Sequence, residues 1–479
     1  MSISRLSYSD QPTTFDELGF SRTAEALLEV INGSIVADTP LTLAIYGAWG
    51  SGKTSLMQMI QARLDRDKYL PIWFDAWRYA QTDSLWRALL VSLVEGLRNH
   101  LLGSGQDTKR ATRLPWMKDQ KPEEARKALN QRLDDLLGSL YRSVERQEPG
   151  SLEINWGAAG KAVTRAVFHL GAGLLPGMSH LVKIVESAQG QLGQGEDITS
   201  LLAAFQREQV KFYKEQVRSL EQFHQNFRAL VDEYVVGSDL VLTIFIDDLD
   251  RCLPEQSLGV LEALKVFLDI PGCIFVLGMD RLIIEHGIRI HYKDFQMNAT
   301  ETAGKSLPMS GRDYLDKVIQ VPFEMPPLEP RAITQFLMDR LGKFTGLDSH
   351  QNRHLAEVMS TGLPRNPRKV KRALNLFRLQ WVLTRPYPSK VNPVYLVKLV
   401  VLQIAAQELY EKIGKDPLLL LDLEASARGK SASRAGEKSP FEAYPLVALT
   451  LSRSPYFEDL SKTDLAQIVF APERDPQNT

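Results

Sequence analysis

The stretch Leu41–Thr54, LTLAIYGAWGSGKT, decides the fold. Its first six residues are mostly apolar on both faces, which is typical of a strand buried in a parallel sheet. The segment Gly47–Thr54 matches the phosphate-binding pattern G-x-x-x-x-G-K-[ST]. A helical pattern, Thr54–Leu64, follows at once, so the loop stands between a strand and a helix, as its mechanism requires. The sequence therefore predicts a P-loop that binds a nucleoside triphosphate.

The chemistry of this loop assigns roles to its residues. Glycines let backbone N–H groups turn inward and cradle phosphate oxygens, and the helix N-terminus adds its positive dipole end. Lys53 is expected to reach the β- and γ-phosphates, and Thr54 to ligate Mg²⁺. The predicted cofactors are ATP and Mg²⁺. The predicted nucleotide-binding residues of the loop are Gly47, Ala48, Trp49, Gly50, Ser51, Gly52, Lys53, Thr54 and Ser55.

Further apolar runs alternate with helical patterns along the chain. Helical patterns follow the second and third runs, at Ser84–Leu97 and Gln256–Leu268. Strand–helix alternation of this kind favours a doubly wound α/β sheet. The four further predicted strands are Leu70–Asp75, Leu240–Ile246, Cys273–Gly278 and Val318–Phe323.

Two carboxylates end the third apolar run. Asp247 is the predicted ligand on the metal side, and Asp248 is the candidate general base beside the attacking water. A glutamate is commoner in that role, because aspartate reaches less far. Asp280, after the next strand, could contact the γ-phosphate or the water, or only cap a helix. Arg251 and Arg281 are candidates to neutralise charge, in the same subunit or on a neighbour's nucleotide, or are ordinary surface arginines.

The remainder of the chain is predicted to be mainly helical. About 160 residues separate the second and third strands, far more than a usual crossover. Within them an aromatic stripe recurs at roughly helical spacing and is best explained by core packing; its members are Phe205, Phe212, Leu220, Phe223, Phe227, Leu230, Val231 and Tyr234. After the sheet, helical patterns cover Arg331–Lys343, Arg353–Ser360, Pro367–Leu379 and Pro393–Ile413. The predicted organisation is an NTPase core in two parts (1–100 and 237–328), a helical insertion (101–236), a helical lid (329–424), a linker (425–439) and a C-terminal segment (440–479).

A basic cluster begins one of these helices. Asn366 suits an N-cap and Pro367 the first helical position. Arg368 could reach over the γ-phosphate from the lid. The whole cluster could instead grip a nucleic-acid backbone, or form an ordinary solvated face. Its members are Arg365, Arg368, Lys369, Lys371 and Arg372.

Three further segments give weaker signals. The adenine reader is not evident, although Arg22 and the Phe20 ring are candidates. The segment Ser461–Asp464 resembles a guanine-reading box but lies far outside the nucleotide core, so we interpret it as the start of a helix. The aromatic residues of WFDAWRY, 73–79, are expected to pack in the core and against the lid.

Composition limits the class of protein. The chain has 479 residues, with 44% hydrophobic and 24% charged residues and a net charge of −1. A global basic field for nucleic acid is therefore absent. The two cysteines, Cys252 and Cys273, make no disulfide framework or metal spacing, which favours a reducing cytosol. The uncharged run Ala166–Val182 is short and contains a proline, so we expect no membrane span and a cytoplasmic protein.

Several segments together resemble the KAP family of P-loop NTPases. They are IYGAWGSGKTSLM, WFDAWRY, IFIDDLDRC, FVLGMDR, DYLDKVIQVPFEMPP and RNPRKVKRALNLF, in family order between Leu18 and Leu409. The resemblance implies a five-stranded, mainly parallel sheet in the order 5-1-4-3-2. Many members carry membrane helices where this chain has its insertion. Bacterial members often look like parts of phage-exclusion or defence systems.

The resulting prediction is an ATPase acting as a switch or assembly engine in a bacterial defence or signalling complex. ATP would draw the lid onto the sheet through Lys53, Asp280 and Arg368, and hydrolysis would release it. Homo-oligomers or partner defence proteins are expected. The alternatives are a nucleic-acid-stimulated ATPase that uses residues 365–372, and a scaffold that holds ATP without hydrolysing it.

Overall fold

The computed structural model describes residues 8–34, 36–82, 84–103, 122–142, 222–267, 269–291, 310–384, 392–430 and 440–470. The chain divides into two compact units, which we describe one at a time. The first comprises Met1–Gly33, Ile45–Leu64 and Phe323–Thr479, and the second Ser34–Ala44 and Asp65–Pro322. These units cut across the domain boundaries expected from the sequence, because the P-loop segment groups with the C-terminal helices.

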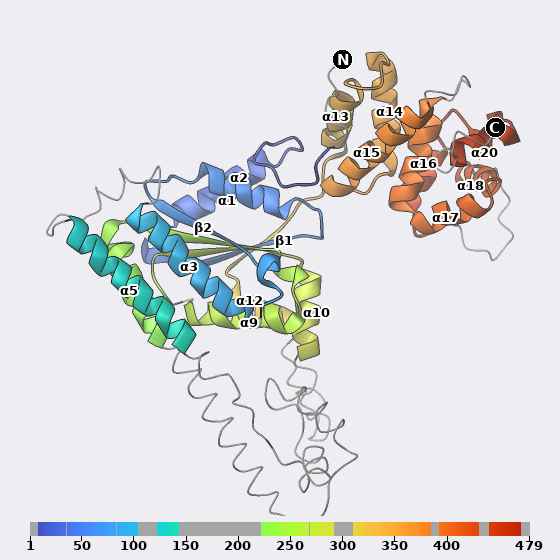
Figure 1. Ribbon diagram of the computed structural model, residues 1–479. Helices are drawn as coiled ribbons and strands as arrows, with labels where there is room; N and C mark the ends of the chain where they lie inside the picture. Colours follow the sequence, from blue (N-terminus) through green and yellow to red (C-terminus); the bar gives the residue numbers. More distant parts are fainter. Residues whose placement is uncertain are drawn as a thin grey trace, which may run out of the picture. The chain divides into compact units, whose positions relative to one another are not determined.

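The sheet has five strands in the order β2-β3-β4-β1-β5. This is the predicted order 5-1-4-3-2 counted from the other edge, so the predicted fold is confirmed. Figure 1 labels β1 and β2 within the sheet. Strand β2 runs parallel to β3, and β3 parallel to β4. The strands are β1 (Leu41–Tyr46), β2 (Tyr69–Asp75), β3 (Val241–Asp247), β4 (Cys273–Met279) and β5 (Val321–Glu324).

Helices in the second unit pack closely on this sheet. Helix α3 (Leu85–Leu102) packs on β2 and on α9 (Pro254–Phe267), and α5 (Pro122–Arg142) packs on α3 (Figure 1). Gly96 permits this approach, since a Cβ there would lie 2.6 Å from Ile72 Cδ1. Every residue of β3 and of β4 is buried, which explains their apolar sequences. Helix α10 (Arg281–His291) packs on α9 and on α12 (Gly311–Val318).

The described end of the insertion is a helix over residues 222–234. Phe223 and Phe227 are buried, stack at 5.8 Å between ring centroids, and both meet Phe267 edge-on. Core packing of the aromatic stripe is thus confirmed for these residues. The earlier part of the stripe, from Phe205 to Leu220, lies outside the described residues.

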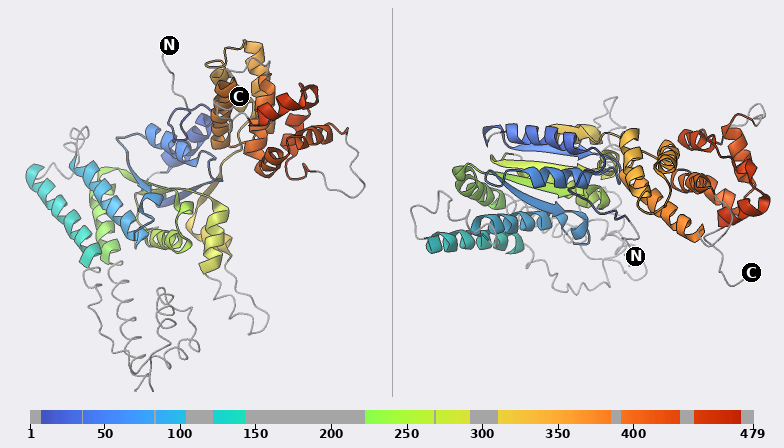
Figure 2. Two further views of the ribbon diagram at one scale, coloured as in Figure 1. Left: turned by 45° about the vertical axis from the view of Figure 1, so that its right-hand side comes forward. Right: turned by 90° about the horizontal axis from the view of Figure 1, so that it is seen from above.

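The first unit combines the N-terminal segment, the P-loop and the C-terminal helices. Helix α1 (Ser21–Gly33) packs on α2 (Lys53–Arg63). Among the later helices, α14 packs on α13, α16 and α19, and α15 packs on α16. Figure 2 shows this helical region, coloured orange to red, from two further sides. Those helices are α13 (Pro330–Leu341), α14 (Ser349–Gly362), α15 (Pro367–Thr384), α16 (Pro393–Ala405), α17 (Gln407–Lys415), α18 (Leu419–Ala427), α19 (Pro445–Leu451) and α20 (Lys462–Phe470).

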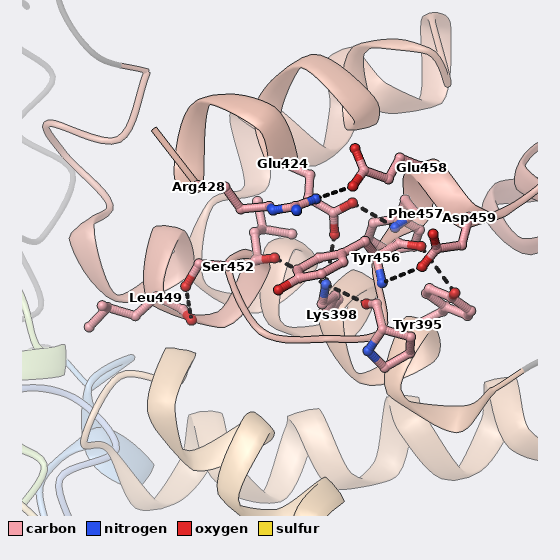
Figure 3. Close-up of polar contacts among 12 residues, drawn as sticks. Tyr395, Lys398, Glu424, Arg428, Leu449, Ser452, Tyr456, Phe457, Glu458 and Asp459 are labelled. Carbon is pink, nitrogen blue, oxygen red and sulfur yellow. Dashed lines mark hydrogen bonds and ion pairs between the residues drawn. The ribbon is translucent and has the colours of Figure 1, made fainter. Parts of the chain in front are cut away.

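A buried ion pair ties the last helices together (Figure 3). The Nζ of Lys398 donates to Glu424 Oε1 at 2.7 Å, to Pro455 O at 2.8 Å and to Leu451 O at 3.0 Å. The other carboxylate oxygen of Glu424 accepts from Phe457 N–H at 2.6 Å. The side chains of Lys398 and Glu424 are only 0% and 2% exposed. All three ammonium donors are therefore used, and helices α16 and α18 are joined to the turn after α19.

Three expected boundaries were wrong. Val318 was expected to start the last strand but ends helix α12, which a Ser310 capping box starts; it is buried at helical spacing with Tyr314 and Leu315, and the strand begins only at Val321. The helix expected over Pro393–Ile413 breaks at Ala406, where the chain turns so that α17 packs on α18 and α20. Helix α18 occupies the start of the expected linker up to Ala427, and Arg428 beyond it lies 3.6 Å from the Tyr456 ring.

Three further expectations concern the Ser461–Asp464 segment, the cysteines and membrane spans. The Ser461 side chain accepts from Asp464 N–H at 3.1 Å and starts α20, as predicted. Both cysteines are buried free thiols. Within the described ranges, no helix combines the length and apolar character needed to cross a bilayer. The run Ala166–Val182 lies outside those ranges.

Candidate nucleotide-binding site

The P-loop has the backbone that phosphate binding requires. Gly50 and Gly52 adopt positive φ values of 81° and 101°, a region that side chains rarely tolerate. A Cβ on Gly47 would lie 2.6 Å from Ser51 Oγ and 3.0 Å from Met325. Gly52 is the N-cap of α2, so the helix dipole points into the loop. These glycines are therefore fixed by geometry as well as by the motif.

The polar residues of the loop fit a bound triphosphate. Lys53 is only 6% exposed, and its Nζ lies 2.7 Å from Gly47 O, so it is held along the loop. Ser51 Oγ is buried, and no described residue offers it a hydrogen bond. A phosphate oxygen would supply that partner. Ser55, also predicted here, instead accepts from Thr13 N–H at 3.2 Å.

The start of α15 is hydrogen-bonded to the P-loop within the same unit. Asn366 caps α15 by accepting from Arg368 N–H at 3.1 Å and Lys369 N–H at 3.2 Å. Its Nδ2 donates at the same time to Trp49 O at 2.9 Å. A Cβ on Gly50 would lie 2.9 Å from Asn366 Oδ1. One side chain therefore fixes both the helix N-terminus and the loop backbone.

The predicted lid arginine lies beside the loop. The guanidinium of Arg368 is 5.0 Å from the Trp49 ring centroid, and its Nε is 3.7 Å from Asp10 Oδ2. Trp49 as a whole residue is 65% exposed. Of the two adenine candidates, the Phe20 ring lies against Gly52, 3.3 Å from where a Cβ would stand. Arg22 is exposed on the first turn of α1.

The acidic residues lie at the carboxyl end of β3, in the second unit. Asp247 is 3% exposed and pairs in register with Asp75 of β2. Asp248 has a positive φ of 57°, which turns the chain sharply into a 3₁₀ segment, Leu249–Arg251. Burial, followed by the neighbouring carboxylate of Asp247, raises the pKa of Asp248 to about 7. Such a shifted carboxyl group is typical of a functional site.

Both candidate arginines have partners in their own subunit. Arg251 lies 2.9 Å from Asp248, and Arg281 lies 2.7 Å from Glu285 of the same helix. Action across a subunit interface stays a prediction. Asp280 caps α10, because its side chain accepts from Leu282 N–H at 3.1 Å.

Three features of the site region were not predicted from the sequence. Asp250 accepts from Asp280 N–H at 3.0 Å and so ties the ends of β3 and β4 together. Asn366 contacts the P-loop as well as capping its helix. Trp77 is 57% exposed, whereas core packing was expected. An apolar residue type does not reveal that Trp77 is exposed. Contacts between segments far apart in the sequence produce no pattern in the spacing of neighbouring residues.

The implied Mg²⁺ would rely on few protein ligands. Nowhere in the described ranges do three or more His, Cys, Asp or Glu side chains gather as a metal group. Magnesium in nucleotide sites usually takes one or two protein ligands, with phosphates and waters supplying the rest. Thr54, at the start of α2, and Asp247, the last residue of β3, are oxygen donors of the kind that Mg²⁺ prefers, and they stay the predicted ligands.

A P-loop between β1 and α2, with acidic residues ending β3, defines a P-loop nucleotide-binding protein. A family model, the KAP family P-loop domain, matches residues 20–381. The chain belongs to the KAP family of P-loop NTPases.

The chain shares less than 30% sequence identity with the individual relatives that it matches. The chain is 23% identical over 407 residues to the phage T7 exclusion protein of Escherichia coli (strain K12), covering 81% of this chain and 44% of that protein. It is 27% identical over 300 residues to NTPase KAP family P-loop domain-containing protein 1 of Mus musculus, covering 57% and 45%. The chain thus spans less than half the length of these relatives.

The chain is also similar to solved structures, at low identity. A Walker-type ATPase of Pyrococcus abyssi aligns over 92% of this chain at 14% identity, with a TM-score of 0.34. The Drosophila origin recognition complex bound to DNA aligns over 99% at 11% identity, with a TM-score of 0.37.

Proposed function

We propose that this chain is an ATP-hydrolysing switch that serves in the exclusion of phage. The observation that carries the switch is Asn366, which caps α15 and donates to Trp49 O in the P-loop. A nucleotide that reorganises the loop would change the partner of this cap. The C-terminal helices that pack with α15 would then respond to the nucleotide state.

The hydrolytic part of the proposal rests on the acidic residues. Asp247 would ligate Mg²⁺, and Asp248 would accept the proton of the attacking water. Lys53 and Arg368 would neutralise phosphate charge, and Asp280 would help to hold the water. The phage-exclusion role is supported by similarity to the phage T7 exclusion protein. The change in the C-terminal helices would act on other copies of this chain in a homo-oligomer, or on partner defence proteins.

The test compares two variants with the wild-type chain. Lys53→Ala should abolish tight binding of Mg·ATP in equilibrium dialysis without unfolding the chain. Asp248→Asn should keep binding but lower turnover by about 10²–10⁴-fold, the usual worth of a positioned base. Unchanged affinity in Lys53→Ala would refute the phosphate site. A wild-type chain that binds ATP but never hydrolyses it would be a nucleotide-dependent scaffold.

A nucleic-acid-stimulated ATPase is the second candidate. The observation that favours it is the exposure of Arg365, Lys369 and Arg372 near the start of α15. Backbone phosphates would bind such cations in a salt-dependent manner. Turnover measured with and without single- and double-stranded DNA and RNA decides between the two candidates. Stimulation that disappears when these three residues are changed to glutamine would favour this one.

A further inference from the structure

Trp77 is an exposed aromatic residue whose ring carries a cation. It lies in a short 3₁₀ segment, η2 (Trp77–Tyr79), just after β2. The guanidinium carbon of Arg251 lies 5.3 Å from its ring centroid. A cation over the face of a tryptophan ring is attracted by the negative charge density of that face. Its neighbours Phe74 and Tyr79 stack on each other instead, at 5.3 Å.

The backbone beneath Trp77 is fixed from three directions. Ala76 N–H donates to Asp247 O at 3.0 Å, which joins the start of η2 to the end of β3. Arg78 N–H donates to Asp75 Oδ1 at 3.2 Å, and Gln256 Nε2 donates to Ala80 O at 2.8 Å. The ring of Trp77 is therefore presented from a defined position although it is open to solvent.

Arg251 connects this ring to the candidate base. Its NH2 group lies 2.9 Å from Asp248 Oδ1 while its guanidinium carbon lies over the Trp77 ring. A guanidinium can do both at once, because its flat face stacks on a ring and its edge donates to a carboxylate. Lysine has no such plane. The αL turn at Asp248 brings residue 251 back toward residue 248, which makes the contact possible.

We propose that Trp77 is a positioning residue that acts through Arg251, which holds one oxygen of Asp248 and leaves the other for the attacking water. The chain of contacts is Trp77 ring, Arg251 guanidinium, Asp248 carboxylate. It deepens the proposed function, because its kinetic consequence rests on hydrolysis by this site. Its structural consequence, energetic coupling between Trp77 and Asp248 through Arg251, does not depend on hydrolysis.

The structural consequence is tested by a set of combined variants. Trp77→Ala, Arg251→Met and Asp248→Asn are made singly and in all combinations, and the Tm of each full-length chain is measured. The Tm shifts of Trp77→Ala and Asp248→Asn should be non-additive when Arg251 is present and additive in Arg251→Met. Additive shifts in both backgrounds, or equal non-additivity in both, would overturn the proposal.

The kinetic consequence separates positioning from simple stability. Trp77→Ala should lower kcat by about 10- to 100-fold, the order expected for a misplaced group, with KM for ATP unchanged. Trp77→Phe should restore most of kcat, because the ring face is kept. Arg87→Met is the matched control, since Arg87 lies 5.2 Å from the Trp86 ring on α3, and kcat should not change. A Trp77→Ala chain with full kcat would contradict the proposal.

The two sets of measurements distinguish failure of the proposed hydrolysis from failure of the positioning role. If the wild-type chain hydrolyses no ATP, the proposed hydrolysis is refuted, and the Tm comparison alone decides whether the contact chain exists. If the wild-type chain hydrolyses ATP and both consequences are absent, the positioning role is refuted and the ATPase stands.

Discussion

At the scale of the residue, single side chains organise the backbone around the P-loop. Asp16 accepts N–H groups from Leu18, Gly19 and Phe20 on Oδ1, and from Ser21 on Oδ2, at 2.7–3.1 Å. This turn sets the position of Phe20, whose ring lies against Gly52. One carboxylate thus supports the start of α1 and one wall of the loop.

The ionisation of Asp16 predicts a pH effect. Burial tends to raise the pKa of Asp16, but hydrogen bonds from Ser21, Phe20 and Leu18 outweigh it and lower the pKa. A lowered folded-state pKa stabilises the fold above the unfolded pKa of about 3.9, and this stabilisation is lost as the pH falls through the folded value.

The measurement is urea unfolding of wild type and Asp16→Asn at pH 6 and at pH 3. Wild type should be more stable at pH 6, and the difference in unfolding free energy should shrink at pH 3. An equal difference at both pH values would show that the charge of Asp16 contributes nothing.

At the scale of the element, two helices begin with the same dipeptide but have different neighbours. Asn366-Pro367 starts α15 and contacts the P-loop, whereas Asn392-Pro393 starts α16 and, among the described residues, caps only its own helix, at Val394 N–H. Comparing Asn366 with Asn392 therefore separates the effect of capping a helix from the effect of contacting the P-loop. Loss of either cap should cost about 0.5–2 kcal/mol of stability.

The prediction concerns nucleotide affinity. Asn366→Ala should change the Kd for Mg·ATP, because it removes the partner of Trp49 O. Asn392→Ala should lower stability to a similar extent and leave the Kd unchanged. Isothermal titration of both variants checks this, and equal Kd values in Asn366→Ala and wild type would exclude a role for the cap in nucleotide binding.

The buried pair in Figure 3 predicts a stability effect in the C-terminal helices. Burial lowers the pKa of Lys398 and raises that of Glu424, so each charge depends on the other. Lys398→Met should cost about 3–5 kcal/mol, because Glu424 stays buried without its counter-charge. Lys398→Met combined with Glu424→Leu should recover part of that loss in urea unfolding. A single variant as stable as wild type would contradict the importance of the pair.

At the scale of the whole molecule, the sequence predicted the sheet but missed how its segments are grouped. Apolar strands and the P-loop have local signatures, and the bounds of β1 were predicted to the residue. The break at Ala406 has no turn residue to signal it. Asn366 was recognised as a cap, but its bond to Trp49 O joins residues 317 positions apart, and one sequence carries no signal for such a pair. The same holds for Trp77 and Arg251.

We propose that α15 senses the nucleotide in the P-loop. Hydrogen exchange of the full-length chain, with and without Mg·ATP, is the decisive test. The amides of Arg368 and Lys369, which donate to the Asn366 cap, should change their exchange rate when ATP binds, and should not change in Lys53→Ala. Unaltered exchange at these amides in wild-type protein that demonstrably binds ATP would contradict the switch.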